Sequence, residues 1–134
     1  MWAESSIVDV NASRKLTNWL PVLLWAGVIF ALSSIPSLGT GLGDWDTILR
    51  KGAHMTEYAV LAVLLLRAVD REAPALALGI LYAASDELHQ AFVRGRHASS
   101  VDVAIDTVGL LIGLLAWRRL QSPHGAQRGR RPPA

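Results

Sequence analysis

Two short pairs of residues in this sequence combine a histidine with a carboxylate at a spacing of three. His54 precedes Glu57, and Asp86 precedes His89. A histidine that a carboxylate orients can transfer protons as a general acid or base, or can attack as a nucleophile. These four residues are therefore the predicted catalytic group.

Basic and amide side chains accompany both pairs. Lys51 lies one turn before His54, and Arg94 and Arg96 follow His89 within the stretch SDELHQAFVRGRH at 85–97. Arginine binds phosphate oxygens in a bidentate manner, whereas lysine acts as a compact point charge. This composition predicts a site for a phosphate or diphosphate group. The predicted ligand-binding residues are Lys51, Arg94, Arg96, Gln90, Asp102 and Asp106.

Other chemistry would use the same residues. The two histidine–carboxylate pairs could contribute ligands to a metal ion of unknown identity, with Asp102 or Asp106 completing an O/N site. The same groups could form a proton or ion pathway. However, the neighbouring stretches AVLAVLLL and GLLIGLLAW have no polar residues that could continue such a pathway across the membrane, which argues against transport. A plainer interpretation is that the groups only pair with one another to stabilise the fold.

The segments that carry these residues are apolar enough for a membrane. Of 134 residues, 51% are hydrophobic and only 18% are charged, whereas soluble domains carry about 25% charged residues. Four apolar runs approach the ~20 residues that a helix needs to cross a bilayer. They cover residues 17–35, 47–69, 74–92 and 100–117. We therefore predict an all-α membrane protein with four transmembrane helices.

Helix-start signals agree with two of these segments. Asp46 is a plausible N-cap of the second segment, because aspartate can accept hydrogen bonds from the free N–H groups of a first turn. Ser99 and Asp102 have the spacing of a capping box at the start of the fourth segment.

The distribution of basic residues predicts the orientation. If all four segments span the membrane, nine lysine and arginine residues fall on the side of the two termini and four fall on the other side. Because cytoplasmic segments carry the excess of positive charge, both termini are predicted to be cytoplasmic. The predicted divisions are a cytoplasmic segment 1–16, a transmembrane domain 17–117 and a basic tail 118–134, expected to be disordered. The loops 36–46 and 93–98 would then be extracytoplasmic, and residues 70–73 cytoplasmic.

The composition also restricts the partners. A short basic tail beside a membrane is more typical of contact with anionic lipid than of nucleic-acid binding. The chain contains no cysteine, so it has neither disulfides nor thiolate metal ligands.

Helical spacing predicts that the polar residues meet. At about 100° per residue, Lys51, His54 and Glu57 share one helix face. Asp86, His89 and Gln90 share a face on the third segment. Asp102 and Asp106 share one on the fourth, which Gly109 and Gly113 continue, and small residues at that spacing let helices approach closely. We therefore predict one polar pocket at the outer end of segments two to four, to which Ser33 and Ser34 of the first segment add hydroxyl groups.

Three stretches of the chain form a specific combination when taken together. They are LSSIP at the end of the first segment, KGAHMTEYAVL in the second, and DELHQAFVRGRHASSVDVAIDTVGLLIG across the last two. Over about residues 30–113 the sequence resembles the VanZ-like family of small bacterial membrane proteins. The resemblance implies a multi-pass protein of the bacterial cytoplasmic (inner) membrane with a role in the cell envelope. The family's namesake is linked to glycopeptide-antibiotic resistance, notably to teicoplanin.

Two functions fit these observations. The first is an enzyme that acts on a phosphorylated envelope lipid, such as a polyprenyl phosphate or a phospholipid. It requires a histidine that lies close to a carboxylate and to basic groups. The second is a non-catalytic binder of a lipid headgroup, a glycopeptide or a partner protein, which requires only a pocket with a basic rim.

Overall fold

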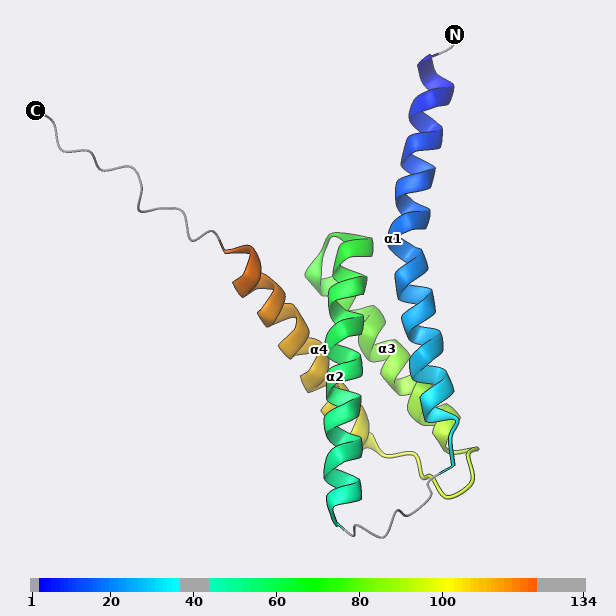
Figure 1. Ribbon diagram of the computed structural model, residues 1–134, viewed down its shortest axis with the longest axis vertical. Helices are drawn as coiled ribbons and strands as arrows, with labels where there is room; N and C mark the ends of the chain where they lie inside the picture. The colour runs from blue at the N-terminus through cyan, green and yellow to red at the C-terminus, as the bar shows by residue number, and fades with distance from the viewer. Residues whose placement is uncertain (1–2, 37–43, 123–134) are drawn as a thin grey trace, which may run out of the picture.

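The computed structural model describes residues 3–36 and 44–122, with side chains from residue 16 onward. Within these ranges the chain forms four α-helices and no strand (Figure 1). The all-α fold predicted from the apolar segments is therefore confirmed. The helices are α1 (Ala3–Ser33), α2 (Asp44–Val69), α3 (Glu72–Gln90) and α4 (Ser100–Gln121).

Local signals explain where α2 and α4 begin and end. Helix α2 begins at Asp44, so Asp46 lies within its first turn and not at the predicted N-cap position. Negative charge in the first turn is favoured by the helix dipole. The hydroxyl of Ser99 accepts a hydrogen bond from the backbone N–H of Asp102 at 3.4 Å, so the predicted cap of α4 is confirmed. Asp70 has a φ of 56°, a left-handed conformation that ends α2.

The first helix is longer than its apolar run. It begins at Ala3 rather than at residue 17, because no proline or glycine interrupts residues 3–16. Pro21 lies inside α1 without ending it. Most of the predicted 36–46 loop and of the 118–134 tail lies outside the described residues.

Three helices are long and apolar enough to cross a membrane. These are the segment Leu16–Ser33 of α1, the whole of α2 and the whole of α4. Large apolar side chains such as Leu23, Leu81 and Leu115 are well exposed, as expected for faces that contact lipid. The chain is thus a membrane protein. Helix α3 is not among the three, because its last two turns carry many polar residues, and its predicted span remains a prediction.

The helices run alternately up and down, which places their polar ends together. In Figure 1 the ends of α1 and α3 and the starts of α2 and α4 lie at the same end of the molecule. We call this the polar end. The other end holds the short connection between α2 and α3 and the last turn of α4 (Figure 1).

Glycine allows α4 to pack directly on the backbone of α2. A Cβ atom on Gly109 would lie 2.5 Å from the carbonyl oxygen of Met55, and one on Gly113 would lie 2.2 Å from that of Ala59. Neither distance leaves room for a methyl group. The predicted close approach through these two glycines is confirmed, and it fixes the register between the polar residues of α2 and α4.

Hydrogen bonds donated by two aromatic side chains attach α1 to its neighbours. The indole Nε1 of Trp25 donates to the carbonyl oxygen of Glu57 at 2.9 Å. The Tyr82 hydroxyl of α3 donates to the carbonyl oxygen of Ala26 at 2.5 Å. These bonds hold α1 against both α2 and α3, and the buried side chains of Ile29 and Tyr58 belong to the core that lies among the helices.

Candidate functional site

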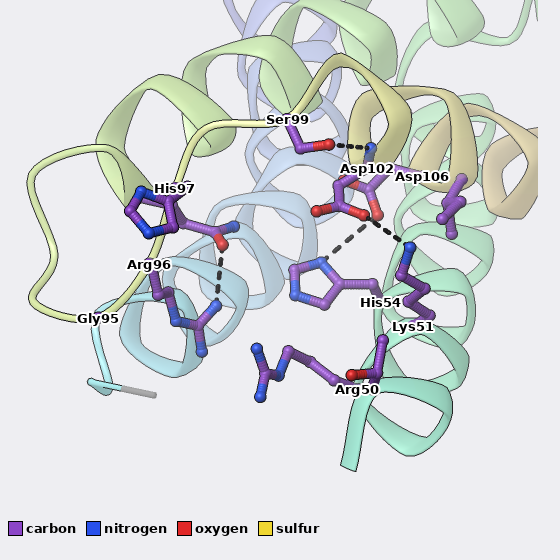
Figure 2. Close-up of a pocket in the computed structure, with 12 residues that line it drawn as sticks. Arg50, Lys51, His54, Gly95, Arg96, His97, Ser99, Asp102 and Asp106 are labelled. Carbon is purple, nitrogen blue, oxygen red and sulfur yellow. Dashed lines mark hydrogen bonds and ion pairs between the residues drawn. The ribbon is translucent and has the colours of Figure 1, made fainter. Parts of the chain in front are cut away.

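A cavity of about 290 Å³ opens at the polar end, between α2, α4 and the segment that follows α3. Figure 2 shows its lining side chains approaching from these elements. The residues that line it are Thr47, Arg50, Lys51, His54, Gln90, Gly95, Arg96, His97, Ser99, Asp102, Ile105 and Asp106. Six of the ten predicted site residues are among them.

The His54 ring and the Asp106 carboxylate face each other at the inner wall of this cavity (Figure 2). The Nδ1 atom of His54 lies 3.4 Å from Oδ1 of Asp106, and the carboxylate side chain is fully buried. The contact exists because Gly109, one turn below Asp106, lets the two helices touch. Because Nδ1 points at Asp106, the opposite ring nitrogen, Nε2, faces the cavity. A histidine held in this way can take up or release a proton there.

Lys51 and Asp102 form a second pair, nearer the mouth. The Nζ atom of Lys51 lies 3.4 Å from Oδ1 of Asp102, and their side chains are 42% and 36% exposed. Exposed ion pairs contribute only about 0–1 kcal/mol. An incoming anion could therefore replace Asp102 as the partner of Lys51 at little energetic cost.

Arg50 is a site residue that the sequence pattern did not identify. Its side chain is exposed, lines the cavity and has no ion-pair partner within the described chain. In Figure 2 its guanidinium points across the cavity mouth towards that of Arg96. A signal was present, because Arg50 precedes His54 by four residues and so shares its helix face.

Arg96 is fixed by three acceptors. It donates to Oε1 of Gln90 at 2.9 Å and to the carbonyl oxygen of Ile35 at 3.1 Å, with a longer contact of 3.5 Å to that of Leu32. Burial, and then the charge of Arg50, lower the pKa of the Arg96 guanidinium. Arginine nevertheless stays charged at neutral pH because its ordinary pKa is so high. Gly95, with a φ of 76°, supplies the left-handed turn that brings Arg96 back to the cavity.

Asp86 lies behind the cavity and ties α3 to α1. Its Oδ2 atom accepts hydrogen bonds from the Ser33 hydroxyl at 2.7 Å and from the Gln90 amide at 3.0 Å. Since Gln90 also accepts from Arg96, a continuous chain of hydrogen bonds joins Arg96 to a carboxylate that is only 2% exposed. Asp86 does not line the cavity itself.

Three other predicted site residues also lie outside the cavity. The His89 ring stacks on Phe30 with centroids 4.2 Å apart, and its Nε2 lies 3.0 Å from the Ser34 hydroxyl, so it faces α1. Glu57 is half-buried and does not reach the lining. Arg94 is exposed in the loop after α3. The expectation that both histidines surround one cavity is met by His54 only.

Glu87 is a supporting residue whose role the sequence did not reveal. Its side chain is only 4% exposed, and its Oε2 atom accepts a hydrogen bond from the backbone N–H of Ser99 at 2.9 Å. This bond holds the start of α4 against the end of α3. It therefore helps to position Asp102 at the mouth.

Several buried polar atoms beneath the cavity have no hydrogen-bond partner in the described chain. They are Nδ1 of His54, the Tyr58 hydroxyl, Oδ1 of Asp86 and both carboxylate oxygens of Asp106. Buried polar groups are usually satisfied by protein or by ordered water. Among the residues with described positions, no three histidine or acidic side chains are arranged to hold a metal ion. The metal alternative therefore gains no support from this geometry.

Comparison with known proteins identifies a family to which the chain is similar. A family model described as VanZ/LLP1 matches residues 3–121, which include all four helices and the whole cavity lining. Neither the curated proteins nor the solved structures contain a match to the chain.

Proposed function

Because this chain belongs to the VanZ/LLP1 family, we propose that it is a multi-pass protein of the bacterial cytoplasmic membrane that binds a phosphorylated lipid headgroup in the cavity at its polar end. In this proposal the cavity opens on the outer face of the membrane. The ligand is an envelope lipid such as a polyprenyl phosphate, polyprenyl diphosphate or phospholipid.

The observation that carries the proposal is the convergence of three cations on one cavity. Arg50, Lys51 and Arg96 all line it, opposed by the carboxylates of Asp102 and Asp106. The Arg50 guanidinium is unpaired within the described chain, and Lys51 has only an exposed partner. A phosphate group would supply the oxygens that these donors lack. The 290 Å³ of space is several times the ~30 Å³ that a water molecule occupies in the liquid.

The surroundings of the cavity favour a lipid over a soluble phosphate. Ile48, Leu49 and Val101 are each more than half exposed, and they lie on α2 and α4 directly beside the residues that line the mouth. In a membrane these side chains contact acyl or prenyl chains. A lipid could therefore place its headgroup among the cations while its chain stays in the bilayer.

The His54–Asp106 pair provides a means of catalysis. In hydrolysis, His54 would accept the proton of a water molecule as its oxygen bonds to phosphorus. The bond between phosphorus and the leaving oxygen would break, and the leaving oxygen would take its proton from the His54 imidazolium. Asp106 would stabilise the imidazolium that forms. Such a general base typically contributes about 10²–10⁴ in rate.

A specific observation favours the second candidate, binding without turnover. His54 is the one predicted catalytic residue that lines the cavity, since Glu57, Asp86 and His89 all lie outside it. In that case the protein would act as a receptor for a headgroup, a glycopeptide or a partner protein. Either activity would connect the protein to glycopeptide susceptibility through the envelope.

The test is to present polyprenyl phosphate and diphosphate in micelles and to measure both binding and phosphate release, with a divalent cation or with a chelator. His54→Ala should abolish release and retain binding. His89→Ala is the matched control, because it removes a histidine that faces α1. Binding by the wild type without any turnover would favour the receptor. Absence of binding, or binding that survives Arg50→Gln and Lys51→Gln together, would refute the proposed site.

A further inference from the structure

A second hollow lies at the end of the bundle opposite the polar end. It has a volume of about 430 Å³ and forms where α2 ends, α3 begins and α4 ends. Its lining residues are Leu66, Arg67, Asp70, Arg71, Glu72, Trp117, Arg118 and Gln121. We propose that this hollow binds the headgroup of an anionic glycerophospholipid in the other membrane leaflet.

The charges in the hollow leave two arginines available for a ligand. Arg118 donates to both carboxylate oxygens of Glu72, through Nε and one terminal nitrogen. The charges of Arg118 and Glu72 therefore cancel each other, and the pair joins α4 to α3. Arg67 and Arg71 form no ion pair within the described chain, and Asp70 is the remaining acidic residue in the lining. The unpaired charge is therefore positive and suits a phosphodiester, which arginine binds in a bidentate manner.

The short connection between α2 and α3 positions these two arginines. Arg67 lies in the last turn of α2, and Arg71 immediately precedes α3. Asp70, with its φ of 56°, turns the chain sharply between them. Both guanidinium groups thus border one hollow, although they belong to different elements.

The apolar part of the lining favours a lipid as the occupant. Leu66 and Trp117 line the hollow beside the arginines. Leu120, one turn beyond Trp117 on α4, is 80% exposed. Indole rings favour the boundary between headgroups and hydrocarbon, and an acyl chain could cover the leucine. A soluble anion would use the arginines and leave these apolar side chains uncovered.

The position of the hollow agrees with this assignment and separates it from the proposed phosphate cavity. Two helices that are long enough to cross a membrane, α2 and α4, both end at the hollow. It therefore lies at headgroup depth in the leaflet opposite the polar end. Anionic lipids at a membrane surface attract basic residues at such helix ends.

The test is native mass spectrometry of the full chain titrated with phosphatidylglycerol or phosphatidylethanolamine of identical acyl chains. Each arginine at a membrane surface contributes about fivefold in affinity for anionic lipid. Arg67→Gln with Arg71→Gln should therefore weaken phosphatidylglycerol binding about 25-fold at one site. Phosphatidylethanolamine has the same phosphodiester but no net charge, so the wild type should bind it more weakly and the double variant should lose less of that affinity.

Arg119→Gln is the matched control, because Arg119 is exposed at the same end of α4 and does not line the hollow. It should change the affinity less than twofold. Equal losses in Arg71→Gln and Arg119→Gln would show a diffuse surface charge and would overturn the proposal, as would a wild type that does not prefer phosphatidylglycerol. Size-exclusion chromatography checks folding, and Arg71→Gln alone, in the exposed connection, decides the question if the double variant aggregates.

Discussion

Replacing Gly109 or Gly113 with alanine should loosen the contact that forms the candidate site. An added Cβ needs about 3.4 Å for an ordinary contact, but only 2.5 Å is available at Gly109 and 2.2 Å at Gly113. The opposing atoms are backbone carbonyl oxygens, so no side chain can rotate away. Helix α4 must therefore recede by 0.9 Å at the first position and 1.2 Å at the second.

The energetic and functional effects follow from that displacement. Overpacking of this kind costs about 1–3 kcal/mol, partly offset by the ~1 kcal/mol that alanine gains over glycine within a helix. We expect a net loss of up to about 2 kcal/mol in the free energy of unfolding for each variant. If the recession at Gly109 carries one turn to Asp106, its 3.4 Å distance from His54 becomes longer than an ion pair allows.

The assay is reversible unfolding in mixed micelles, combined with binding of polyprenyl phosphate. Gly52→Ala is the matched control, because a Cβ there would meet no atom within 4 Å. This variant should be as stable as the wild type or up to about 1 kcal/mol more stable. The packing argument is refuted if Gly113→Ala is as stable as Gly52→Ala and binds the lipid normally.

Three further outcomes are expected. Asp102→Asn should raise the affinity for polyprenyl phosphate severalfold, because it frees Lys51 from its exposed partner and removes a repelling charge; an unchanged or lower affinity in a micelle binding assay would contradict this. Asp106→Asn should lower phosphate release more than lipid binding, as measured by separate rate and affinity determinations, and a loss confined to binding would show that Asp106 is structural. In the cysteine-free chain, an impermeant thiol reagent should label His97→Cys in intact cells and Ala73→Cys only after permeabilisation, and the reverse pattern would invert the topology.

The fold could be predicted largely from the lengths of the apolar runs and the signals at their ends. Ser99 marked the start of α4 because its hydroxyl caps the helix in the way that its spacing to Asp102 suggests. The apolar run agrees with the span Leu16–Ser33, but it could not give the start of α1, because such a run defines what a membrane can cover and not where a helix must begin. Polar residues continue α1 back to Ala3, as long as nothing in the chain breaks it.

Helical spacing correctly predicted the residue pairs between α2 and α4. It failed for α3, whose polar face contacts two different neighbouring parts of the fold. Lys51 with Asp102 and His54 with Asp106 were correctly expected to converge across α2 and α4. His89 was expected in the pocket but packs against α1. A helical wheel shows that His89 shares a face with Asp86, but it does not show which neighbouring helix that face contacts.

Arg50 was not identified from the sequence for a different physical reason. Arg50 occupies the His54 face at a spacing of four, but helical spacing does not show how far a long side chain reaches along the helix. Its long side chain reaches the cavity mouth. The expected role of Arg96 was also incomplete, because its backbone acceptors at Leu32 and Ile35 are more than 60 positions away in the sequence.

Two separate parts of the fold form the walls of the cavity. Backbone contacts at Gly109 and Gly113 lock α4 to α2, and α2 carries Arg50 and Lys51. Arg96 instead belongs to a loop that hydrogen bonds join to the end of α1. An anion held between Arg96 and Lys51 would crosslink the two walls noncovalently, and it would oppose their separation on heating. At a ligand concentration 100 times the dissociation constant, this linkage is worth about 2.7 kcal/mol, so a thermal-shift screen of envelope lipids could reveal the ligand before any reaction is known.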